Sequence, residues 1–564
     1  MSRPLVIQKD RTILLDGHHP LYPELRDLLS RFAELEQSLQ HVHLYRLTRL
    51  SLWNAAAGGL TPDALLEELA RHARYGLPEE VARWIRATMS RYGRLTLLRR
   101  GEDLLLRGDD PALVAHLARS PLLRPLLQGI HDPLTLRFQP GHRGLLKMRL
   151  RLLGYPPLDR AGYLPGAPLA VRLRGTLPDG RPFALRPYQQ EAVRAFLSGP
   201  QGGSGVIVLP CGAGKTVVGL AVMAHLRCQT LILCPHAAAL HQWRQEILAR
   251  TTLEAHEVGE YSGERKEIAP VTLATYQVLT HRAPAGGERF PRLPHLDLFE
   301  ERDWGLIIYD EVHLLPAPVF RLTAELQARR RLGLTATLVR EDGRQGDVFS
   351  LIGPKVYEAP WRELEAQGWL AAVSCWEVRV PLSNAGRLDY VQAHGTSARS
   401  RLAAENPAKV SLVRRLVERH AGERILIIGR YLHSLRAIAH ALGAPLITGR
   451  TPPAEREELY RAFRRGEKPL LVVSNVANLA LDLPEAGVAI QVSGTYGSRQ
   501  EEAQRLGRIL RPKPDGRPAH FYTLVSQDTG EQEYAARRER FLIEQGYRYT
   551  IVPAEAFAGE EAGR

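Results

Sequence analysis

Apolar positions follow a helical period in the first part of the chain. In "TPDALLEELARHA" (61–73) and "GLPEEVARWIRATMSRYG" (76–93) they recur every three or four residues, as on the buried side of an amphipathic helix. Thr61 precedes the first run and is expected to cap that helix through its hydroxyl. These segments predict consecutive helices, and residues 1–130 are expected to form a mostly helical domain.

A two-stranded hairpin is predicted next, in "RLTLLRRGEDLLLRG" (94–108), where two apolar runs flank a Gly-Glu-Asp turn. Helix, helix and two-stranded wing is the order of a winged-helix domain, and an α-helical protein-docking domain fits the same pattern. Residues 131–180 are rich in Pro, Gly and Arg, which predicts a small β-rich module followed by a linker.

From residue 181 onward the pattern becomes a repetition of strand, loop and helix. Each strand candidate is short, apolar and bounded by turns, as strands are when helices cover both faces of a parallel sheet. The first set, in residues 181–357, comprises "GVIVLP" (205–210), "TLILCP" (230–235), "VTLATY" (271–276), "GLIIYD" (305–310) and "RLGLTA" (331–336). The second set, in residues 424–550, comprises "RILIIG" (424–429), "APLITG" (444–449), "PLLVVSN" (469–475), "GVAIQVS" (487–493) and "AHFYTLV" (519–525). The fold class predicted is α/β with two parallel-sheet lobes.

The segments beside the second set are expected to be less regular. Residues 358–423 are predicted to link the lobes, with a strand pair around "SCWEVRVPL" (374–382) and a helix in "NPAKVSLVRRLVERH" (406–420). "QDTGEQEYAARRERFLIEQGYRY" (527–549) predicts a charged amphipathic helix and a short strand. Residues 551–564 are expected to be frayed.

Composition narrows the class of protein. A chain of 564 residues is too long for one core, so several domains are expected. It lacks an apolar run near the roughly 20 residues of a spanning helix, and its start lacks a signal-peptide pattern, so a cytoplasmic protein is expected. The net charge of +14 favours a polyanionic partner, although a genomic preference for Arg codons explains the Arg/Lys ratio. None of the four cysteines forms a CxxC pair that would suggest a zinc site or a disulfide frame.

The stretch "LPCGAGKT" (209–216) has the spacing of a phosphate-binding P-loop, with Leu in place of the usual first Gly. Backbone N–H groups around the two glycines would face phosphate oxygens, and the start of the following helix favours an anion. Lys215 would reach the β- and γ-phosphates, and the Thr216 hydroxyl would bind Mg²⁺. The nucleotide-binding residues predicted are Leu209, Pro210, Cys211, Gly212, Ala213, Gly214, Lys215 and Thr216.

Two carboxylates follow the strand candidate at 305–310, in "WGLIIYDEVHLL". The carboxyl end of a parallel strand is where such sheets bind ligands. Asp310 would hold Mg²⁺ through water, while Glu311 would position and deprotonate the attacking water. Together with the P-loop, this pair predicts hydrolysis of ATP or GTP.

Arginines in "QRLGRILR" (504–511) would complete that site. Arg508 and Arg511 are three residues apart and would share one side of a helix. Because they belong to the second lobe, they would meet the γ-phosphate only when two lobes close. Arginine supplied in this way stabilises the transition state of phosphoryl transfer, typically by about 10³- to 10⁵-fold in rate.

These motifs, in this order with "GLTAT" (333–337), resemble those of superfamily 2 helicases, which implies two tandem RecA-like lobes. The sequence is more similar to one branch, the XPB (xeroderma pigmentosum group B) DNA helicases, nearly continuously over residues 181–550. The stretches that carry this likeness are "LRPYQQEAV" (185–193), "SGVIVLPCGAGKT" (204–216), "WGLIIYDEVH" (304–313), "LGLTATLVRED" (332–342), "LIGPKVYEA" (351–359), "GSRQEEAQRLGRILR" (497–511) and "LVSQDTGEQEYAARRERFLIEQGY" (524–547). Residues 32–57 also look like the N-terminal domain of that branch.

The resemblance implies further roles for matching residues. Gln189, near Arg186, would read the adenine, so ATP with Mg²⁺ is the expected cofactor. His313 would link the nucleotide site to the second lobe. The residues implied to couple ATP to DNA are Thr335 and Thr337, those implied in strand opening are Arg340, Glu341 and Asp342, and those implied to complete the ATP site are Gln504, Arg508 and Arg511. Residues 131–180 occupy the place of a damage-recognition-like domain, and 381–405 that of a thumb-like insertion. The chain departs from the family pattern at 474–486, where Asn475 stands at a position that often carries Lys.

Three functions remain open on this evidence. The resemblance implies a 3′–5′ DNA helicase that opens single-stranded, forked or duplex substrates in repair or transcription. A duplex translocase without net unwinding uses the same motifs. An ATP-timed DNA-opening scaffold that recruits a nuclease or a transcription factor through residues 1–130 is the third. Phosphate contacts from loops at strand ends are expected in all three, at 262–266, 275–277, 429–434 and 449–450.

Overall fold

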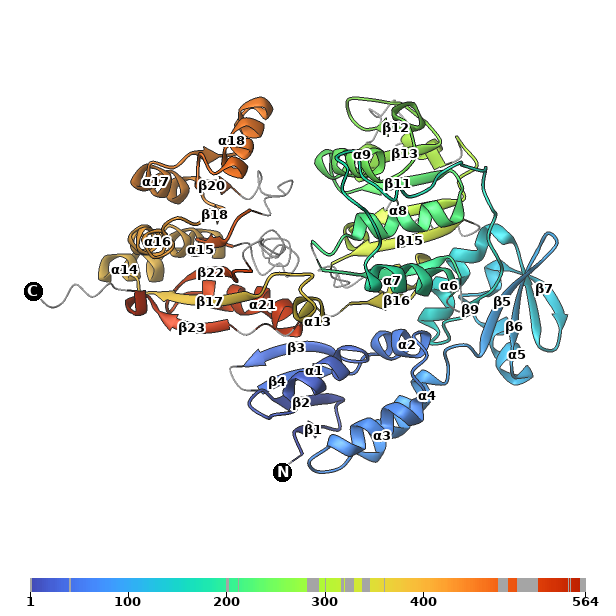
Figure 1. Cartoon of the computed structure of the whole chain (residues 1–564). Coiled ribbons are helices and arrows are strands. Elements are labelled where there is room, and N and C mark those ends of the chain that lie inside the picture. Colours follow the sequence, from blue (N-terminus) through green and yellow to red (C-terminus); the bar gives the residue numbers. More distant parts are fainter. Residues whose placement is uncertain are drawn as a thin grey trace, which may run out of the picture. The chain divides into compact units, whose positions relative to one another are not determined.

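The computed structural model divides into two compact units, Met1–Leu209 with Gly214–Ala359, and Pro210–Ala213 with Pro360–Arg564. The residues that it describes are 3–39, 42–198, 202–210, 212–280, 294–299, 301–315, 319, 329–336, 345–359, 361–474, 485–494, 516–545, 547 and 549–557. Figure 1 shows the chain coloured from its N-terminus to its C-terminus. None of the helices within these residues is both long and apolar enough to cross a membrane.

The first unit begins with a four-stranded antiparallel sheet of order β1-β2-β4-β3. Ile13 pairs with Tyr45, and Leu15 with His43, and all four side chains are buried. The elements are β1 (Leu5–Ile7), β2 (Thr12–Asp16), α1 (Tyr22–Ser30), β3 (Glu34–Leu39), β4 (Val42–Arg46), α2 (Arg49–Ala57), α3 (Pro62–His72) and α4 (Glu79–Met89). The predicted helices α3 and α4 are confirmed, and the Thr61 hydroxyl accepts a hydrogen bond from the N–H of Ala64 as a cap. The N-terminal region therefore carries a sheet as well as helices, and the expectation that it is mostly helical was too narrow.

A five-stranded sheet of order β7-β8-β6-β5-β9 follows. Its elements are β5 (Leu95–Arg100), β6 (Asp103–Gly108), α5 (Pro111–Arg119), β7 (Leu127–Asp132), β8 (Thr135–Phe138), α6 (Arg143–Leu152) and β9 (Leu158–Asp159). The predicted hairpin is β5 and β6, but it lies inside this sheet, because β8 pairs with β6 and β9 with β5. The hairpin is therefore not the free wing of a winged helix, and the sheet crosses the domain boundary expected at residue 130.

The third part of the first unit is a seven-stranded parallel sheet of order β12-β13-β11-β14-β15-β10-β16. Its strands are β10 (Ser204–Val208), β11 (Thr230–Cys234), β12 (Val258–Tyr261), β13 (Val271–Thr275), β14 (Leu306–Asp310), β15 (Arg330–Thr335) and β16 (Lys355–Glu358). Its helices are α7 (Pro187–Ser198), α8 (Lys215–Leu226), α9 (Ala237–Arg250), α10 (Tyr276–Thr280) and α12 (Gln345–Leu351). All five strands predicted for this lobe are confirmed, while β12 and β16 were missed.

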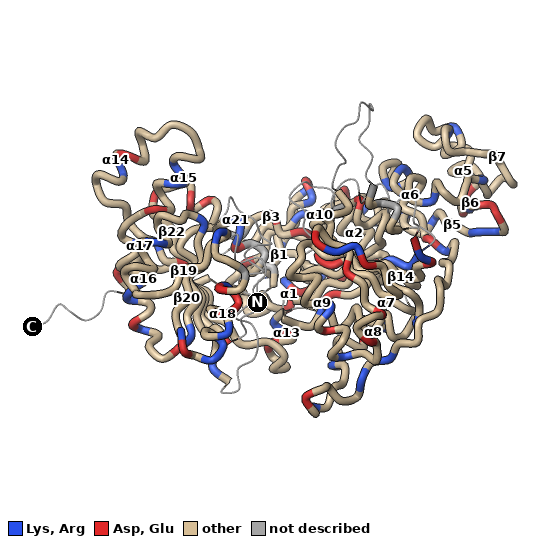
Figure 2. The backbone as a smooth tube through the Cα atoms, turned by 90° about the horizontal axis from the view of Figure 1, so that it is seen from above, with Lys and Arg blue, Asp and Glu red and all other residues tan. Residues whose placement is uncertain are grey.

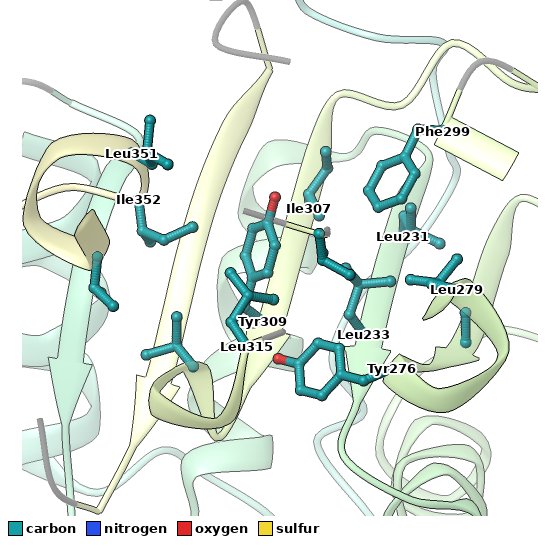
Figure 3. Close-up of a cluster of buried hydrophobic side chains, with 14 of the residues drawn as sticks. Leu231, Leu233, Tyr276, Leu279, Phe299, Ile307, Tyr309, Leu315, Leu351 and Ile352 are labelled. Atoms are coloured by element: carbon teal, nitrogen blue, oxygen red, sulfur yellow. The ribbon is translucent and has the colours of Figure 1, made fainter. Parts of the chain in front are cut away.

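The central strands of this lobe are apolar on both faces because helices cover both sides of the sheet. Every residue of β10, β11 and β13 is buried. Ile307 and Tyr309 of β14 belong to a buried cluster with residues from β10, β11, α10 and α12. Figure 3 shows this core, in which Leu231, Leu279 and Phe299 lie together. The strand ends, where the P-loop and the two carboxylates stand, are thereby anchored in a rigid core.

The second unit contains another seven-stranded parallel sheet, of order β19-β20-β18-β21-β22-β17-β23. Its strands are β17 (Val373–Val380), β18 (Ile425–Gly429), β19 (Leu446–Ile447), β20 (Leu470–Ser474), β21 (Val488–Gln491), β22 (Ala519–Ser526) and β23 (Tyr549–Pro553). Its helices are α13 (Trp361–Ala366), α14 (Asn384–Gln392), α15 (Thr396–Ala404), α16 (Ala408–Arg419), α17 (Leu432–Leu442), α18 (Pro453–Arg465) and α21 (Glu531–Glu544). The α/β class with two parallel-sheet lobes is confirmed.

Two expectations for this unit need correction. The predicted strand around 374–382 is β17, which pairs in parallel with β22 and β23 and so belongs to this sheet rather than to a separate strand pair. Residues 551–553 were expected to fray but form part of β23, because they pair with Glu377, Val378 and Arg379. The thumb-like segment at 381–405 contains the helices α14 and α15.

Charged residues of both signs are distributed along the backbone in Figure 2. Helix α18 illustrates the mixture, because Arg461 and Arg465 form ion pairs with glutamates of the same helix. Such exposed pairs contribute little to stability. Charges paired in this way cancel locally and do not mark a binding surface, so a nucleic-acid site has to be located from particular side chains.

Candidate functional site

The predicted P-loop lies between β10 and α8, at the carboxyl end of the parallel sheet. Gly212 and Gly214 both have a φ of +83°, a left-handed conformation that favours glycine. The N–H of Leu209 donates to the carbonyl of Thr335 at 3.0 Å, and the N–H of Ala213 donates to that of Pro210 at 3.2 Å. The loop therefore leaves β10 tied to the end of β15 and turns sharply into the N-terminus of α8.

Gln189 of α7 lies directly against this loop. A Cβ added to Gly214 would stand 2.6 Å from Nε2 of Gln189, and the left-handed φ of +83° also favours glycine at this approach. The side-chain Oε1 of Gln189 accepts a hydrogen bond from the N–H of Arg186 at 3.0 Å, and the Arg186 guanidinium contacts the Tyr188 hydroxyl at 3.1 Å. Two residues that the sequence predicts at the nucleotide are thus joined to each other and brought to the P-loop.

The three residues predicted to act on the phosphates also meet here. Lys215, the first residue of α8, forms an ion pair with Oε1 of Glu311 at 3.3 Å. Asp310 is the last residue of β14, and Glu311 follows it with a φ of +48°, an uncommon left-handed conformation for a residue with a Cβ. This backbone turn lets the two consecutive carboxylates point in different directions. Their predicted roles, metal binding by Asp310 and activation of water by Glu311, require this.

The environment drives the pKa values of these two carboxylates in opposite directions. Burial raises the pKa of Asp310 to about 6, and the neighbouring charge of Glu311 adds to the rise. Burial also acts to raise the pKa of Glu311, but the charges of Lys215 and His313 outweigh it, and the pKa is lowered. Glu311 therefore stays ionised at neutral pH, while Asp310 is a buried acid whose charge calls for a cation beside it.

His313 connects Glu311 to the end of β15. Its Nδ1 lies 2.7 Å from the Thr335 hydroxyl and 3.5 Å from Oε2 of Glu311. The Thr335 hydroxyl also donates to Oε2 of Glu311 at 3.4 Å. Since His313 is 4 % exposed and Thr335 fully buried, this network is held in place by the core of the lobe.

Two contacts of Asp310 were not foreseen from the sequence. Trp243 of α9 donates its indole N–H to Oδ2 of Asp310 at 3.0 Å, and the Tyr276 hydroxyl donates to the main-chain oxygen of Asp310 at 2.8 Å. Trp243 stands in the mixed polar and apolar stretch "LHQWRQEIL" and Tyr276 in the more apolar "VTLATYQVL", and in both an aromatic side chain is expected on the core side. The only sequence signal for these two contacts is the polar atom on each ring, because a buried indole or phenol needs a hydrogen-bond partner.

The remaining predicted site residues lie outside the described part of the chain. These are Cys211, Thr337, Arg340, Glu341, Asp342, Gln504, Arg508 and Arg511. The altered motif at 474–486 also falls almost wholly outside it. Their predicted roles stay predictions.

Mg²⁺ fits the donor set that the structure brings together. The ion prefers oxygen ligands, and the Asp310 carboxylate and the Thr216 hydroxyl stand at the ends of β14 and at the start of α8. The glycine turn of the P-loop, which a Cβ at Gly214 would obstruct, leaves backbone N–H groups for phosphate. These residues would hold a nucleoside triphosphate with its metal ion.

A recess in the second unit offers a different site for an anion. It lies where α15, α21 and the ends of β18 and β21 meet, and Arg430, Tyr431, Tyr534 and Arg538 are among its lining residues. Arg538 is 1 % exposed. The one carboxylate of the lining, Glu531, is already paired with buried Lys409 at 2.8 Å. Two arginines thus stand among the residues that line the recess.

Three family models match the chain. The model described as "ERCC3/RAD25/XPB C-terminal helicase" matches residues 364–562, and "Type III restriction enzyme, res subunit" matches 182–340. "Helicase conserved C-terminal domain" matches residues 5–130.

Curated relatives match over nearly the whole length. The chain is 54 % identical to the DNA 3′-5′ helicase XPB of Kineococcus radiotolerans, covering 99 % of this chain and 97 % of the relative. It is 50 % identical to the DNA 3′-5′ helicase XPB of Mycobacterium tuberculosis, covering 99 % of each. In Saccharomyces cerevisiae, the general transcription and DNA repair factor IIH helicase/translocase subunit XPB/SSL2 is 30 % identical, covering 98 % of this chain and 72 % of the relative.

Proposed function

Because the chain belongs to the XPB family of superfamily 2 DNA helicases, we propose that it hydrolyses ATP with Mg²⁺ at the P-loop and moves 3′ to 5′ along DNA to open it. The observation that carries this proposal is the meeting of Lys215, Asp310 and Glu311 at one edge of the sheet, with Lys215 3.3 Å from Glu311. A charge pair with opposed pKa shifts at a P-loop suits phosphoryl transfer better than a structural role.

The ion pair between Lys215 and Glu311 suggests how nucleotide binding prepares hydrolysis. The γ-phosphate competes with Glu311 for the ammonium group of Lys215, since both are anions within reach of one flexible side chain. When Lys215 turns to the phosphate, Glu311 is released as an ionised base that orients and deprotonates water. Thr216 and Asp310 would hold Mg²⁺, which would supply neutralisation of phosphate charge when bound.

The network of His313, Thr335 and Glu311 supports a path from hydrolysis to movement. Thr335 ends β15, directly before the segment with Thr337 and the Arg340-Glu341-Asp342 motif. A change at Glu311 alters the hydrogen bonds of Thr335, because the two side chains lie 3.4 Å apart. We propose that this network transmits the state of the nucleotide to the predicted DNA-opening motif.

The recess of the second unit, which Arg430 and Arg538 line, supports a contact with a DNA phosphate. Arg430 lies in the stretch 429–434 where the sequence predicts such a contact, and its main-chain N–H donates to the Ser493 hydroxyl at 2.8 Å. Phosphate contacts are independent of sequence and weaken with salt, as a moving enzyme requires. Replacing Arg430 with Ala is expected to weaken DNA binding and to flatten its salt dependence.

A protein partner in repair or transcription is part of the proposal, with residues 1–130 as the docking region. The yeast relative is named as a subunit of a transcription and repair factor. The mixed sheet-and-helix architecture of β1–α4 gives this region a core of its own, with Leu5, Ile13, Leu52 and Leu69 fully buried.

The deciding experiment is ATP turnover by the full chain without nucleic acid and with single-stranded DNA, forked DNA and RNA. We expect stimulation by DNA and displacement of the strand from a fork with a 3′ single-stranded arm. Lys215→Ala should abolish turnover while DNA binding persists. Equal turnover with and without DNA would contradict the helicase assignment, and turnover unchanged in Lys215→Ala would contradict the site. Displacement of a triplex strand without fork opening would favour a duplex translocase.

A further inference from the structure

Trp243 lies behind the carboxylate of Asp310 rather than in contact with the expected nucleotide. It belongs to α9, is 1 % exposed, and directs its one polar atom to Oδ2 of Asp310 at 3.0 Å. A buried indole satisfied by any carbonyl would serve packing alone. Here the partner is instead one oxygen of the carboxylate at which the proposed metal ion binds.

Packing fixes the plane of this indole. Gly219 of α8 lies against the ring, and a Cβ added there would stand 2.5 Å from Cη2 of Trp243 and 3.3 Å from a methyl group of Leu334. The ring therefore fills a slot between α8 and β15 that closes if Gly219 gains a side chain. Because the ring has no room to turn, the direction of its N–H is set by α8, the helix that also begins with Lys215.

The main chain of Asp310 is fixed independently. The Tyr276 hydroxyl donates to its carbonyl oxygen at 2.8 Å, and Tyr276 is 4 % exposed. With its backbone held by Tyr276 and one oxygen held by Trp243, the Asp310 side chain loses the freedom to rotate. Oδ1 is the carboxylate oxygen that Trp243 does not hold.

We propose that Trp243 is a positioning residue, whose indole N–H holds Oδ2 of Asp310 so that the other oxygen is presented to the Mg²⁺ that accompanies the nucleotide. The inference rests on the proposed function, because it takes Asp310 as the metal-binding carboxylate. Groups that orient a metal-binding side chain typically change metal affinity by about 10- to 100-fold when they are removed. A positioning role therefore predicts a decrease of that size in metal affinity, with little change in nucleotide affinity when no metal is present.

The test uses the full chain with Trp243→Phe, which keeps an aromatic ring and removes the N–H. Binding of a fluorescent ADP analogue is measured in EDTA and during titration with Mg²⁺, and direct binding of Mn²⁺ is followed by electron paramagnetic resonance. We expect unchanged nucleotide affinity in EDTA and a half-saturating Mg²⁺ concentration about 10- to 100-fold higher than in the wild type. The same shift is expected for Mn²⁺.

Trp304→Phe is the matched control. Trp304 is fully buried in the same lobe, but its N–H donates to the main-chain oxygen of Leu298 at 3.0 Å. Loss of this N–H should leave the metal titration unchanged. A shift as large in Trp304→Phe as in Trp243→Phe would overturn the proposal, because it would show a general effect of destabilising the lobe.

Two further measurements extend the test, and the first of them keeps the proposal falsifiable if Trp243→Phe fails to fold. Benzothienylalanine at position 243 keeps the shape of the ring and replaces only the N–H with sulfur, so it should reproduce the shift. In the background of Asp310→Asn, Trp243→Phe should add nothing further, and an additive loss would overturn the proposal. If the wild type shows no Mg²⁺-dependent nucleotide binding, the proposed function fails. If the wild type shows it and Trp243→Phe has the same metal dependence, only the positioning role fails.

Discussion

Substitution of the buried residue Asp159 is the most informative way to perturb the first unit. Asp159 is 1 % exposed, and its carboxylate lies 2.7 Å from Nη2 of Arg143 and 3.0 Å from Nζ of Lys147. Arg331 of β15, fully buried, adds a third positive charge and donates to the Ser204 hydroxyl at 2.8 Å. Arg143 and Lys147 lie on α6, whereas Arg331 lies on β15, so this cluster joins the five-stranded-sheet domain to the first lobe.

Asp159→Asn leaves these three cations without a buried counter-charge. Removing one partner of a buried ion pair typically costs about 3–5 kcal/mol, because the remaining charge is left desolvated and uncompensated. The direction agrees with the pKa values: burial raises that of Asp159, but the cations outweigh it and hold the pKa well below its ordinary value. Burial already lowers the pKa of Lys147 to about 8, although Asp159 opposes this, so that lysine depends on the carboxylate for its charge.

The pH dependence follows from the sign of the Asp159 shift. A carboxyl group whose pKa is lowered on folding stabilises the folded state above its unfolded pKa of about 3.9, and this contribution is lost as the pH falls through the folded pKa. The difference in stability between wild type and Asp159→Asn should therefore be largest near neutral pH and shrink below about pH 4.

The assay is hydrogen exchange of the full chain, read by mass spectrometry at peptides from 143–163. A chain of several domains does not unfold in one step, so a local probe is needed. A loss of 3–5 kcal/mol corresponds to faster exchange by about 10²- to 10⁴-fold where the local opening governs exchange. Peptides of α16 in the second unit are the internal control.

Two variants calibrate this result. Lys147→Met removes a buried cation while Arg143 still neutralises Asp159, and it should be close to neutral or stabilising. Asp179→Asn removes an exposed carboxylate that pairs with Arg181 at 2.6 Å, and it should change nothing measurable. If Asp159→Asn exchanges like Asp179→Asn, the cluster does not hold the two parts together and the reasoning is refuted.

The remaining predictions concern the nucleotide site. Glu311→Gln should keep ATP bound while slowing its cleavage by several orders of magnitude, so filter-bound nucleotide should rise, and no trapping would place the base elsewhere. Gly214→Ala should weaken nucleotide binding, because its Cβ would meet Gln189 at 2.6 Å; Gly443→Ala, which has a similarly left-handed backbone but no atom within 4 Å of the added Cβ, controls for strain. Arg508→Ala should reduce DNA-stimulated hydrolysis far more than resting ATP affinity, and a proportional loss of affinity would count against an arginine supplied by the second lobe.

Local patterns sufficed for five strands of each parallel sheet and for the residues at the ends of those strands, but not for β12, β16 or the place of β17. A fully apolar strand followed by glycines, or by two carboxylates, is a signal contained within about ten neighbouring residues. Lys215 and Glu311 meet because parallel strands place all their carboxyl ends on one edge, a consequence of topology that the alternation of strand and helix already implies. Gln189 is a different case, because the sequence predicts it at the nucleotide only through the family resemblance.

The N-terminal region shows where local patterns are insufficient. In "LEQSLQHVHLYRL" the strand β4 alternates in burial, but its buried positions are His43 and Tyr45. Neither is an obvious core residue, and only their pairing with Leu15 and Ile13 of β2 makes that face apolar. The hairpin at 94–108 is a similar case, because its place inside a sheet depends on β8 and β9.

What the sequence alone determined is the chemistry: a P-loop, a carboxylate pair and a family whose members are DNA helicases. Each is encoded in a contiguous stretch, because local backbone and side-chain types decide whether phosphate and metal can bind. Only the tertiary structure decided which distant residues hold those chemical groups in place. Trp243 meets Asp310 across 67 positions, and Asp159 gathers cations from α6 and β15. Such contacts arise from packing between distant elements, which no period or spacing along the chain records.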